Sequence, residues 1–175
     1  MQMQINGCVL ELARGNIVTQ NVDAIVNAAN SSLLGGSGVD GAIHRAAGPE
    51  LAIECMMLRG CRTGQAKITK GYRLPARHVI HAVGPRYQNG NHGEAALLSS
   101  AYRSSLALAT QHQLQSIAFP AISMGIYGYP IAEGAEVALR TVIDYLNEHA
   151  GLTLVRFVLF SDDMYNAFSR VLTQV

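Results

Sequence analysis

Charged residues are scarce in this sequence, and their two signs nearly cancel. Only 14% of the 175 residues are charged, and 13 Lys and Arg against 12 Asp and Glu give a formal net charge of +1. A chain with so small a net charge has no long-range attraction for a polyanion. Aromatic residues make up 6% of the chain, so no basic, aromatic-rich surface for stacking on bases is expected. A nucleic-acid partner is therefore not expected, and any phosphate must be recognised by local backbone amides.

Cysteines and long apolar runs are also few. Cys8, Cys55 and Cys61 are odd in number and too sparse for a disulfide framework. Cys55 and Cys61 are six residues apart, wider than the usual zinc pair, and no second pair exists, so we expect no metal site. The first residues have neither a basic region nor a long apolar stretch, and no run approaches a membrane span. We therefore expect a cytoplasmic protein without a signal peptide or a membrane association.

Apolar residues, in contrast, are abundant at 49%, enough for a full core in one domain over residues 1–175. No repeat, linker or low-complexity segment divides the chain. Strand-like and helix-like patterns alternate, which predicts an α/β domain whose central sheet is covered by helices on both faces. The expected strands are 8–13, 23–29, 65–69, 78–83, 116–119 and 153–160, and the expected helices are 39–47, 49–59, 94–112, 131–148 and 162–172.

Two glycine-rich loops each lie between an expected strand and an expected helix, at residues 34–40 and 121–130. Loops with few Cβ atoms let backbone N–H groups converge on an anion, and the following helix N-terminus adds a favourable dipole. Two such loops predict a ligand with a diphosphate that is held from both sides. Because the carboxyl ends of the strands gather the loops at one edge of such a sheet, Asn16 and Asn30 are expected there too.

Six segments, in order along the chain, carry a family resemblance. They are Gly15–Ile17, Val26–Asn30, Gly35–His44, Cys61–Ala66, His78–Pro85 and Pro120–Gly128. Together they resemble the macrodomain family, and specifically its MacroD-type branch, over nearly the whole chain. The resemblance implies a three-layer α/β/α sandwich with a mixed, mostly parallel sheet. It implies ADP-ribose as ligand, with no metal or cofactor. It also implies hydrolysis of esters at the distal ribose, in O-acetyl-ADP-ribose and in mono-ADP-ribose on acidic protein side chains.

The resemblance further implies that Asn30 and Asp40 carry the reaction. The Asn30 amide would bridge two ribose hydroxyls, and Asp40 would orient the water that attacks the ester. From the residues alone, the favoured interpretation of Asn30 is a turn cap, and that of Asp40 is a carboxylate at the start of a helix. Because a helix N-terminus favours the anion, Asp40 is a weak base. We therefore expect it mainly to align the water and the ribose, with a ligand phosphate supplying part of the activation.

The resemblance also implies ligand-binding residues in both loops and at two strand ends. The second loop would hold the diphosphate, the Tyr127 ring would pack on the distal ribose, and Phe160 would lie on the adenine side. The alternatives are a loop aromatic that fixes the loop to the core and an ordinary core residue at a strand end. The expected ligand-binding residues are Asn16, Ile17, Asn30, Gly35, Gly36, Ser37, Gly38, Val39, Ser123, Met124, Gly125, Ile126, Tyr127 and Phe160.

Three of these residues depart from the family pattern. Asn16 stands where the family usually has an Asp that accepts a hydrogen bond from the adenine amino group, and the loss of charge assistance costs about 1 kcal/mol. Ser37 replaces a Gly, at a cost of about 1 kcal/mol if the position needs a positive φ. Met124 replaces a Thr, so a hydroxyl expected near the phosphates is lost. These changes bear on affinity more than on reaction type.

The histidines are expected to be structural. His78 and His81 lie three apart in an expected strand and so on opposite faces. His44 follows Asp40 by four residues, so the two side chains can meet on one helix face. No serine or cysteine stands in a nucleophile pattern, so no covalent intermediate is expected.

A second function remains open from the sequence, namely a module that binds ADP-ribose or its protein conjugates without hydrolysing them. The presence of Asn30 and Asp40 favours the hydrolase, whereas the changes at Asn16, Ser37 and Met124 leave the binding module open. A nucleotide- or RNA-binding regulator is a third reading, which the near-neutral charge disfavours. The expected partners are ADP-ribose, its esters and mono-ADP-ribosylated proteins.

Overall fold

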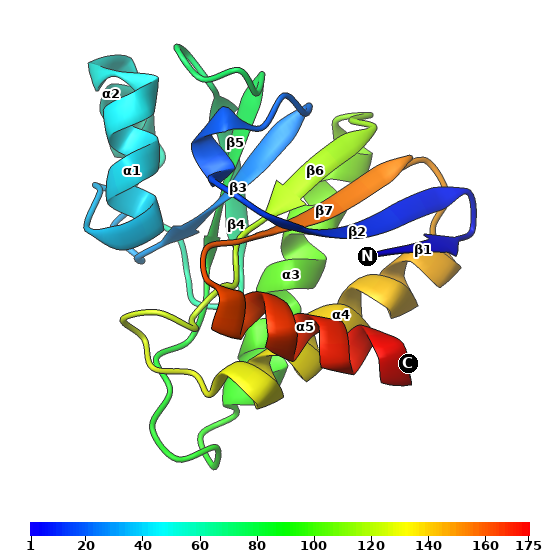
Figure 1. The fold of residues 1–175 in the computed structure, drawn as a ribbon. Coiled ribbons are helices and arrows are strands. Elements are labelled where there is room, and N and C mark those ends of the chain that lie inside the picture. The colour runs from blue at the N-terminus through cyan, green and yellow to red at the C-terminus, as the bar shows by residue number, and fades with distance from the viewer.

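A seven-stranded mixed sheet forms the centre of the computed structural model, which describes residues 1–175 (Figure 1). The strands are β1 (Gln2–Ile5), β2 (Cys8–Arg14), β3 (Ala24–Ala29), β4 (Ala66–Lys70), β5 (His78–Val83), β6 (Ser116–Phe119) and β7 (Leu154–Leu159). Their order is β1-β2-β7-β6-β3-β5-β4. The five inner strands run parallel, and β1 and β4 pair antiparallel at the two edges. The mixed, mostly parallel sheet expected from the sequence is confirmed.

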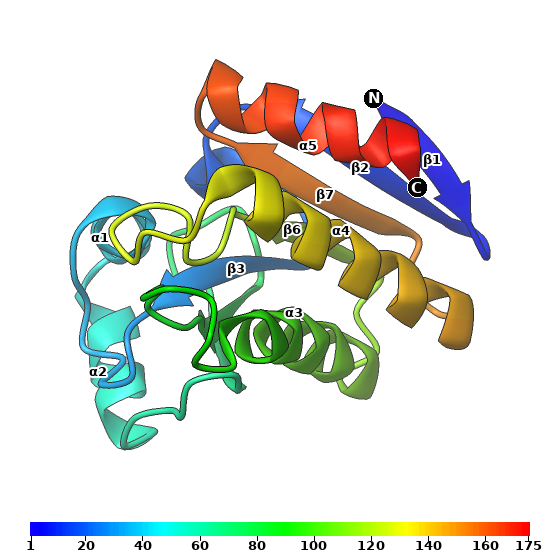
Figure 2. The same cartoon turned by 90° about the horizontal axis from the view of Figure 1, so that it is seen from below.

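Five helices cover the two faces of this sheet. They are α1 (Gly38–Ala47), α2 (Pro49–Met57), α3 (Glu94–Gln111), α4 (Ile131–Glu148) and α5 (Asp162–Gln174). The helices α3, α4 and α5 share one apolar core with the sheet, and α1 and α2 share another (Figures 1 and 2). This is the three-layer α/β/α sandwich that the sequence predicts. None of the five helices combines the length and the apolar character needed to cross a membrane.

A fully buried tyrosine links the larger core to the second glycine loop. The Tyr102 side chain on α3 packs against Phe119 and Phe157, with ring centroids 5.2 and 5.9 Å away. Its hydroxyl accepts a hydrogen bond from the backbone N–H of Ile122 at 2.9 Å and donates to the carbonyl of Pro120 at 3.4 Å. Burial raises the pKa of Tyr102, so the hydroxyl stays neutral and keeps its donor. The core therefore fixes the point where the second loop leaves β6.

The N-terminal strand β1 was not predicted. It pairs with β2 through the two-residue turn Asn6-Gly7, in which Ile5 lies opposite Cys8. Both turn residues have a positive φ, +48° and +80°, as in the hairpin turn that Asn-Gly favours. The Asn-Gly dipeptide was the local sequence signal for this hairpin. The short 3-10 helix η1 (Ile17–Thr19) was also missed.

Most other boundaries lie within one or two residues of the predicted ones. The predicted helix 49–59 ends at Met57, because Arg59 and Gly60 both adopt a positive φ, +58° and +81°. Ser161 caps α5, since its side chain accepts a hydrogen bond from the N–H of Met164.

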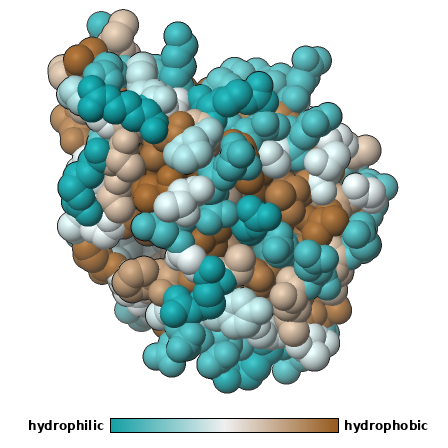
Figure 3. Space-filling model, turned by 45° about the horizontal axis from the view of Figure 1, so that its top comes forward, coloured by the Kyte–Doolittle hydropathy of each residue, from teal (hydrophilic) through white to brown (hydrophobic).

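The three cysteines are buried and unpaired. Burial raises the pKa of Cys8 and of Cys55 to about 11, so both thiols stay protonated near neutral pH. At the surface, hydrophobic and hydrophilic side chains are interspersed over the face shown in Figure 3.

Candidate functional site

The carboxyl ends of the parallel strands bring the predicted site residues to one edge of the sheet. Asn16 follows β2, Asn30 follows β3, the second glycine loop follows β6 and Phe160 follows β7. The first glycine loop leads from Asn30 into α1. In Figures 1 and 2 the second loop, coloured yellow before α4, lies beside α1. The expectation that both loops open at the same edge is confirmed.

The first glycine loop presents a run of unused hydrogen-bond donors. None of the backbone N–H groups from Gly35 to Asp40 donates a hydrogen bond within the chain. Gly35 and Gly38 reach this arrangement with positive φ values of +99° and +61°. Ser37, in contrast, has φ −105° and caps α1 with an extended backbone, so the strain considered for a serine at this position does not arise. The helix dipole of α1 points its positive end at the same donors.

The second glycine loop offers a matching set of donors. The N–H groups of Ser123, Gly125, Ile126 and Tyr127 make no hydrogen bond within the chain. The loop is nevertheless held in shape, because the N–H of Tyr129 donates to the carbonyl of Ser123 at 2.9 Å. Ser123 adopts φ +68°, which is rare for a serine and locally costly. Strain at such a position is typical of functional loops.

Met124 differs from its sister residues in this loop. Its side chain is 5% exposed and packs against Gly134 of α4, and its N–H group donates to the carbonyl of Ala121. The Met124 side chain therefore fills space under α4, and Met124 lacks the free N–H group that its neighbours in the loop have.

Asn30 is fixed by its own loop. Its Nδ2 donates to the carbonyl of Gly35 at 3.0 Å, and its Oδ1 accepts from Ser32 Oγ at 2.7 Å and from the N–H of Leu33 at 3.1 Å. The side chain therefore caps a turn, which is one of the two interpretations of Asn30 that the sequence allowed. Nδ2 keeps a second hydrogen for a ligand, whereas both lone pairs of Oδ1 are already used by Ser32 and Leu33.

Asp40 is brought next to Asn30 by Gly36. A methyl group built on Gly36 would lie 3.1 Å from Asp40 Oδ2 and 3.6 Å from Asn30 Nδ2, so only glycine leaves this space open. The Asp40 side chain is 6% exposed, and its Oδ1 accepts from Asn27 Nδ2 at 2.8 Å. His44 Nε2 lies 3.4 Å from the same oxygen, so the predicted contact on one helix face is confirmed. Oδ2 remains the free oxygen of this carboxylate.

A buried polar chain supports Asp40 from behind. Asn27 Nδ2 also lies 3.1 Å from His81 Nδ1, and His81 Nε2 lies 3.0 Å from Thr69 Oγ1. We assign the proton to His81 Nε2, because Nδ1 faces an amide donor. Burial, with a smaller contribution from His44, lowers the pKa of His81 to about 3. His81 is thus a neutral structural residue, and it holds the amide that orients Asp40.

This buried histidine predicts an acid-dependent loss of stability. The pKa of His81 is about 3 in the folded state and about 6.5 in the unfolded state, so the unfolded state binds more protons between these values. The contribution of His81 to the free energy of unfolding is complete above pH 6.5. It falls as the pH drops towards 3, with a slope of up to about 1.4 kcal/mol per pH unit. Urea unfolding between pH 7 and pH 4 measures this slope. In His81→Gln the slope should be visibly smaller, and an identical slope in both proteins would contradict the assignment.

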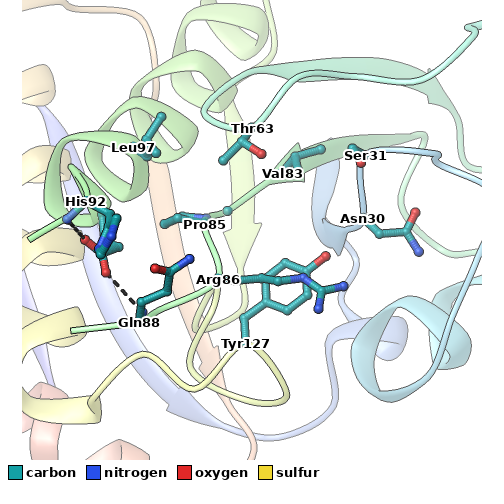
Figure 4. A pocket seen from close by; sticks show the side chains of 12 residues that line it. Asn30, Ser31, Thr63, Val83, Pro85, Arg86, Gln88, His92, Leu97 and Tyr127 are labelled. Atoms are coloured by element: carbon teal, nitrogen blue, oxygen red, sulfur yellow. Dashed lines mark hydrogen bonds between the residues drawn. The ribbon is translucent and has the colours of Figure 1, made fainter. Parts of the chain in front are cut away.

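The two aromatic residues of the second loop have different surroundings. The Tyr129 ring is buried and meets Tyr87 edge-on, with centroids 4.9 Å apart, so it fixes the loop to the core. Tyr127 is half-buried, and the Arg86 guanidinium lies 5.0 Å from the centre of its ring. Tyr127 and Asn30 both line one pocket, with a volume of about 380 Å³ (Figure 4).

The strand ends at the other side of the site are exposed. Asn16 is exposed, and its Oδ1 caps η1 by accepting from the N–H of Val18 at 3.1 Å. The N–H of Ile17 is unused. Phe160 is 80% exposed and Ile126 is 79% exposed. The reading of Phe160 as an ordinary core residue is therefore wrong, and an apolar surface is available at the end of β7.

Sequence reasoning missed the residues that surround Asp40 and Tyr127. Asn27 and His81 lie opposite each other in the register of β3 and β5, which no local pattern shows. Arg86 follows the predicted strand 78–83 by three residues and meets Tyr127 only through the fold. The Gly84-Pro85 dipeptide next to Arg86 was the one local sign that this strand end carries a specialised loop.

Comparison with known proteins places the chain in a family. Residues 26–138 match the Macro domain family. An O-acetyl-ADP-ribose deacetylase of Salmonella typhimurium is 52% identical, over 94% of each chain. A solved Oceanobacillus iheyensis macrodomain with ADP superposes with a TM-score of 0.96 at 44% identity, covering 99% of this chain and 95% of that one. A Trypanosoma brucei macrodomain in complex with ADP-ribose gives 0.88 at 44% identity, covering 93% and 68%. The chain belongs to the Macro domain family.

Proposed function

We propose that this protein hydrolyses ADP-ribosyl esters, both O-acetyl-ADP-ribose and mono-ADP-ribose on acidic protein side chains. The observation that carries the proposal is the pair of glycine loops, whose unused N–H groups flank a site containing Asn30 and Asp40. The relative named as an O-acetyl-ADP-ribose deacetylase and the solved macrodomains with ADP and ADP-ribose support this choice of ligand and reaction.

The diphosphate is held by backbone donors. The N–H groups from Gly35 to Asp40 contact it from the α1 side, and those of Ser123 and of Gly125–Tyr127 contact it from the other. Preorganised amides at a helix N-terminus bind an anion without a cationic side chain, which suits a chain with a net charge of +1. At the adenine end, Asn16 and the N–H of Ile17 contact the base edge, and Phe160 packs on its face.

The distal ribose lies between Asn30 and Tyr127. Asn30 bridges two ribose hydroxyls: Nδ2 donates its second hydrogen to one of them, and Oδ1 accepts from the other in place of the Ser32 hydroxyl. The Tyr127 ring packs on the sugar. This places the ester next to Asp40 Oδ2, the carboxylate oxygen that neither Asn27 nor His44 contacts.

A water molecule aligned by Asp40 Oδ2 attacks the carbonyl carbon of the ester. A new bond forms between the water oxygen and that carbon, and the bond from the carbon to the ribose oxygen breaks. One proton of the water ends on the ribose hydroxyl and the other is released, which leaves ADP-ribose and a carboxylate. Asp40 orients the water and a phosphate of the ligand helps to accept its proton. The reaction needs neither a metal nor a covalent intermediate.

One assay separates this hydrolase from a module that only binds. The protein is incubated with O-acetyl-ADP-ribose and, separately, with a protein that carries ADP-ribose on Glu and Asp. Release of free ADP-ribose from either substrate supports the proposal. Tight binding of ADP-ribose without release from either substrate would refute it and establish the binding module instead.

Asn16→Asp should tighten the binding of ADP-ribose. A carboxylate accepts the hydrogen bond of the adenine amino group with charge assistance, a gain of about 1 kcal/mol or roughly fivefold in Kd. Asp caps a helix as well as Asn does, so the contact to the N–H of Val18 is preserved. Calorimetry measures the change. The hypoxanthine analogue of ADP-ribose, which lacks the amino group, is the control ligand and should gain nothing. An equal gain for both ligands would contradict the contact.

A further inference from the structure

A polar pocket continues from the proposed reaction site towards the loop between β5 and α3. Asn30 and Tyr127 form its border with that site (Figure 4). Its other walls come from segments that do not contact the bound nucleotide in the proposed function. This inference rests on that proposed function. They include Ser31, Thr63, Gly84, Arg86, Gln88 and Leu97. The pocket therefore lies where the acyl side of the ester must leave the ribose.

The pocket is much larger than an acetyl group requires. Its volume is about 380 Å³, whereas a water molecule occupies about 30 Å³ of liquid. An acetyl group, with three heavy atoms, fills only a small part of that space. A pocket of this size suits a longer acyl group or part of a polypeptide.

The only carboxylate in the pocket wall is already satisfied. Glu94 accepts hydrogen bonds from the backbone N–H groups of Gln88, Asn89, Gly90 and His92, at 2.6–3.2 Å. Burial opposes its charged form, yet these hydrogen bonds outweigh burial and hold the pKa of Glu94 at about 2. Glu94 thus fixes the conformation of the loop, and its carboxylate is not available to bind a ligand.

Arg86, unlike Glu94, has no hydrogen-bond partner within the chain. Its side chain is exposed, makes no hydrogen bond or ion pair within the chain, and lies over the Tyr127 ring with its guanidinium towards Asn30 (Figure 4). The stacking on Tyr127 restricts its position. One unpaired, oriented cation therefore faces the space beyond the ester, with no free anion beside it.

We propose that this pocket is an acyl-side subsite for acyl groups longer than acetyl that carry a second negative charge, and that Arg86 determines this specificity. A guanidinium binds a carboxylate through two parallel hydrogen bonds. Two sources share the chemistry. One is a dicarboxylic acyl ester of ADP-ribose, and the other is an acidic residue beside the modified side chain of a polypeptide.

The test compares two esters of equal length. Succinyl and butyryl esters of ADP-ribose have four-carbon acyl groups and differ in one terminal carboxylate. Values of kcat/KM are measured after the rate without enzyme is subtracted. The wild-type protein should prefer the succinyl ester about tenfold, the effect of one charge-assisted contact. In Arg86→Gln the ratio should fall to about one. Any general effect through Tyr127 enters both rates and cancels in the ratio.

Arg170→Gln is the matched control, because Arg170 is exposed on α5 and loses the same charge. It should keep the preference. A second arm uses peptides in which the ADP-ribosylated Glu is flanked by Asp or by Asn. An Arg86-dependent preference in either arm supports the subsite and identifies its source. Loss of the preference in Arg170→Gln as well as in Arg86→Gln would show that the preference comes from the net charge of the protein and would refute the subsite.

The failures are distinguishable. If the acetyl ester is hydrolysed but neither arm shows a preference that depends on Arg86, the subsite is refuted and the hydrolase stands. If no ester is hydrolysed, the proposed function fails and the subsite with it.

Discussion

Asp40→Asn should lower the rate of ester hydrolysis by about 10²- to 10⁴-fold, the range expected when a group that acts on the attacking water is lost. The affinity for ADP-ribose should change by only a few fold. Asn keeps an oxygen that can accept from Asn27 Nδ2, so the side chain stays in place. It replaces the negative oxygen near Asn30 with a neutral group, and that oxygen is the one that aligns the water in the proposed mechanism.

The measurement pairs kinetics with calorimetry on the same protein. Turnover of O-acetyl-ADP-ribose reports the reaction, and titration with ADP-ribose reports binding. Asp144→Asn is the control, since Asp144 is exposed on α4 and its replacement removes the same charge. An unchanged rate in Asp40→Asn would refute its proposed role. Parallel losses of rate and affinity would show that Asp40 holds the ligand and does not act on the water.

Gly84→Ala should damage both the fold and the binding of ADP-ribose. A methyl group at Gly84 would overlap Ser123 Oγ and would lie 2.5 Å from Ile122 Cγ2. Neither neighbour can move freely, because the Tyr102 hydroxyl holds the N–H of Ile122 and Ser123 already has a strained backbone. Overpacking of this kind costs about 1–3 kcal/mol of unfolding free energy. The second loop must shift, so its N–H groups no longer converge on one anion and Kd should rise at least about tenfold.

Urea unfolding and calorimetry with ADP-ribose test the two effects. Gly15→Ala is the control for stability, since a methyl group there would meet nothing nearer than 3.8 Å. It should cost little. A Gly84→Ala protein that is destabilised yet binds ADP-ribose normally would show that the second loop does not hold the diphosphate.

The fold could be predicted because its signals are local. Alternating strand and helix patterns predicted every inner strand and all five helices, and the Gly48-Pro49 dipeptide separated α1 from α2 correctly. The strand β1 was missed although Asn6-Gly7 is a strong hairpin signal, because Gln2–Ile5 is short and mixed in polarity.

The site could be predicted only in part, because side-chain surroundings depend on distant residues. The positions of Asn30 and of both loops follow from the ends of strands. In contrast, Met124 turns into the core because Gly134, ten residues later, leaves room for it. The backbone angle of Ser37 and the exposure of Phe160 likewise depend on packing that no sequence window contains.

The surroundings of Asp40 depend most strongly on residues that are distant in the sequence. Asn27 and His81 meet because β3 and β5 are adjacent in this register, and Thr69 completes the chain from β4. Three strands from separate parts of the sequence therefore define the surroundings of one carboxylate.

A crystal structure of the protein with ADP-ribose tests the central claim most directly. We expect phosphate oxygens within hydrogen-bond distance of N–H groups from Gly35–Asp40 on one side and from Ser123–Tyr127 on the other. The distal ribose should contact Asn30, next to Asp40. A diphosphate bound anywhere else, with these N–H groups still unused, would contradict the account.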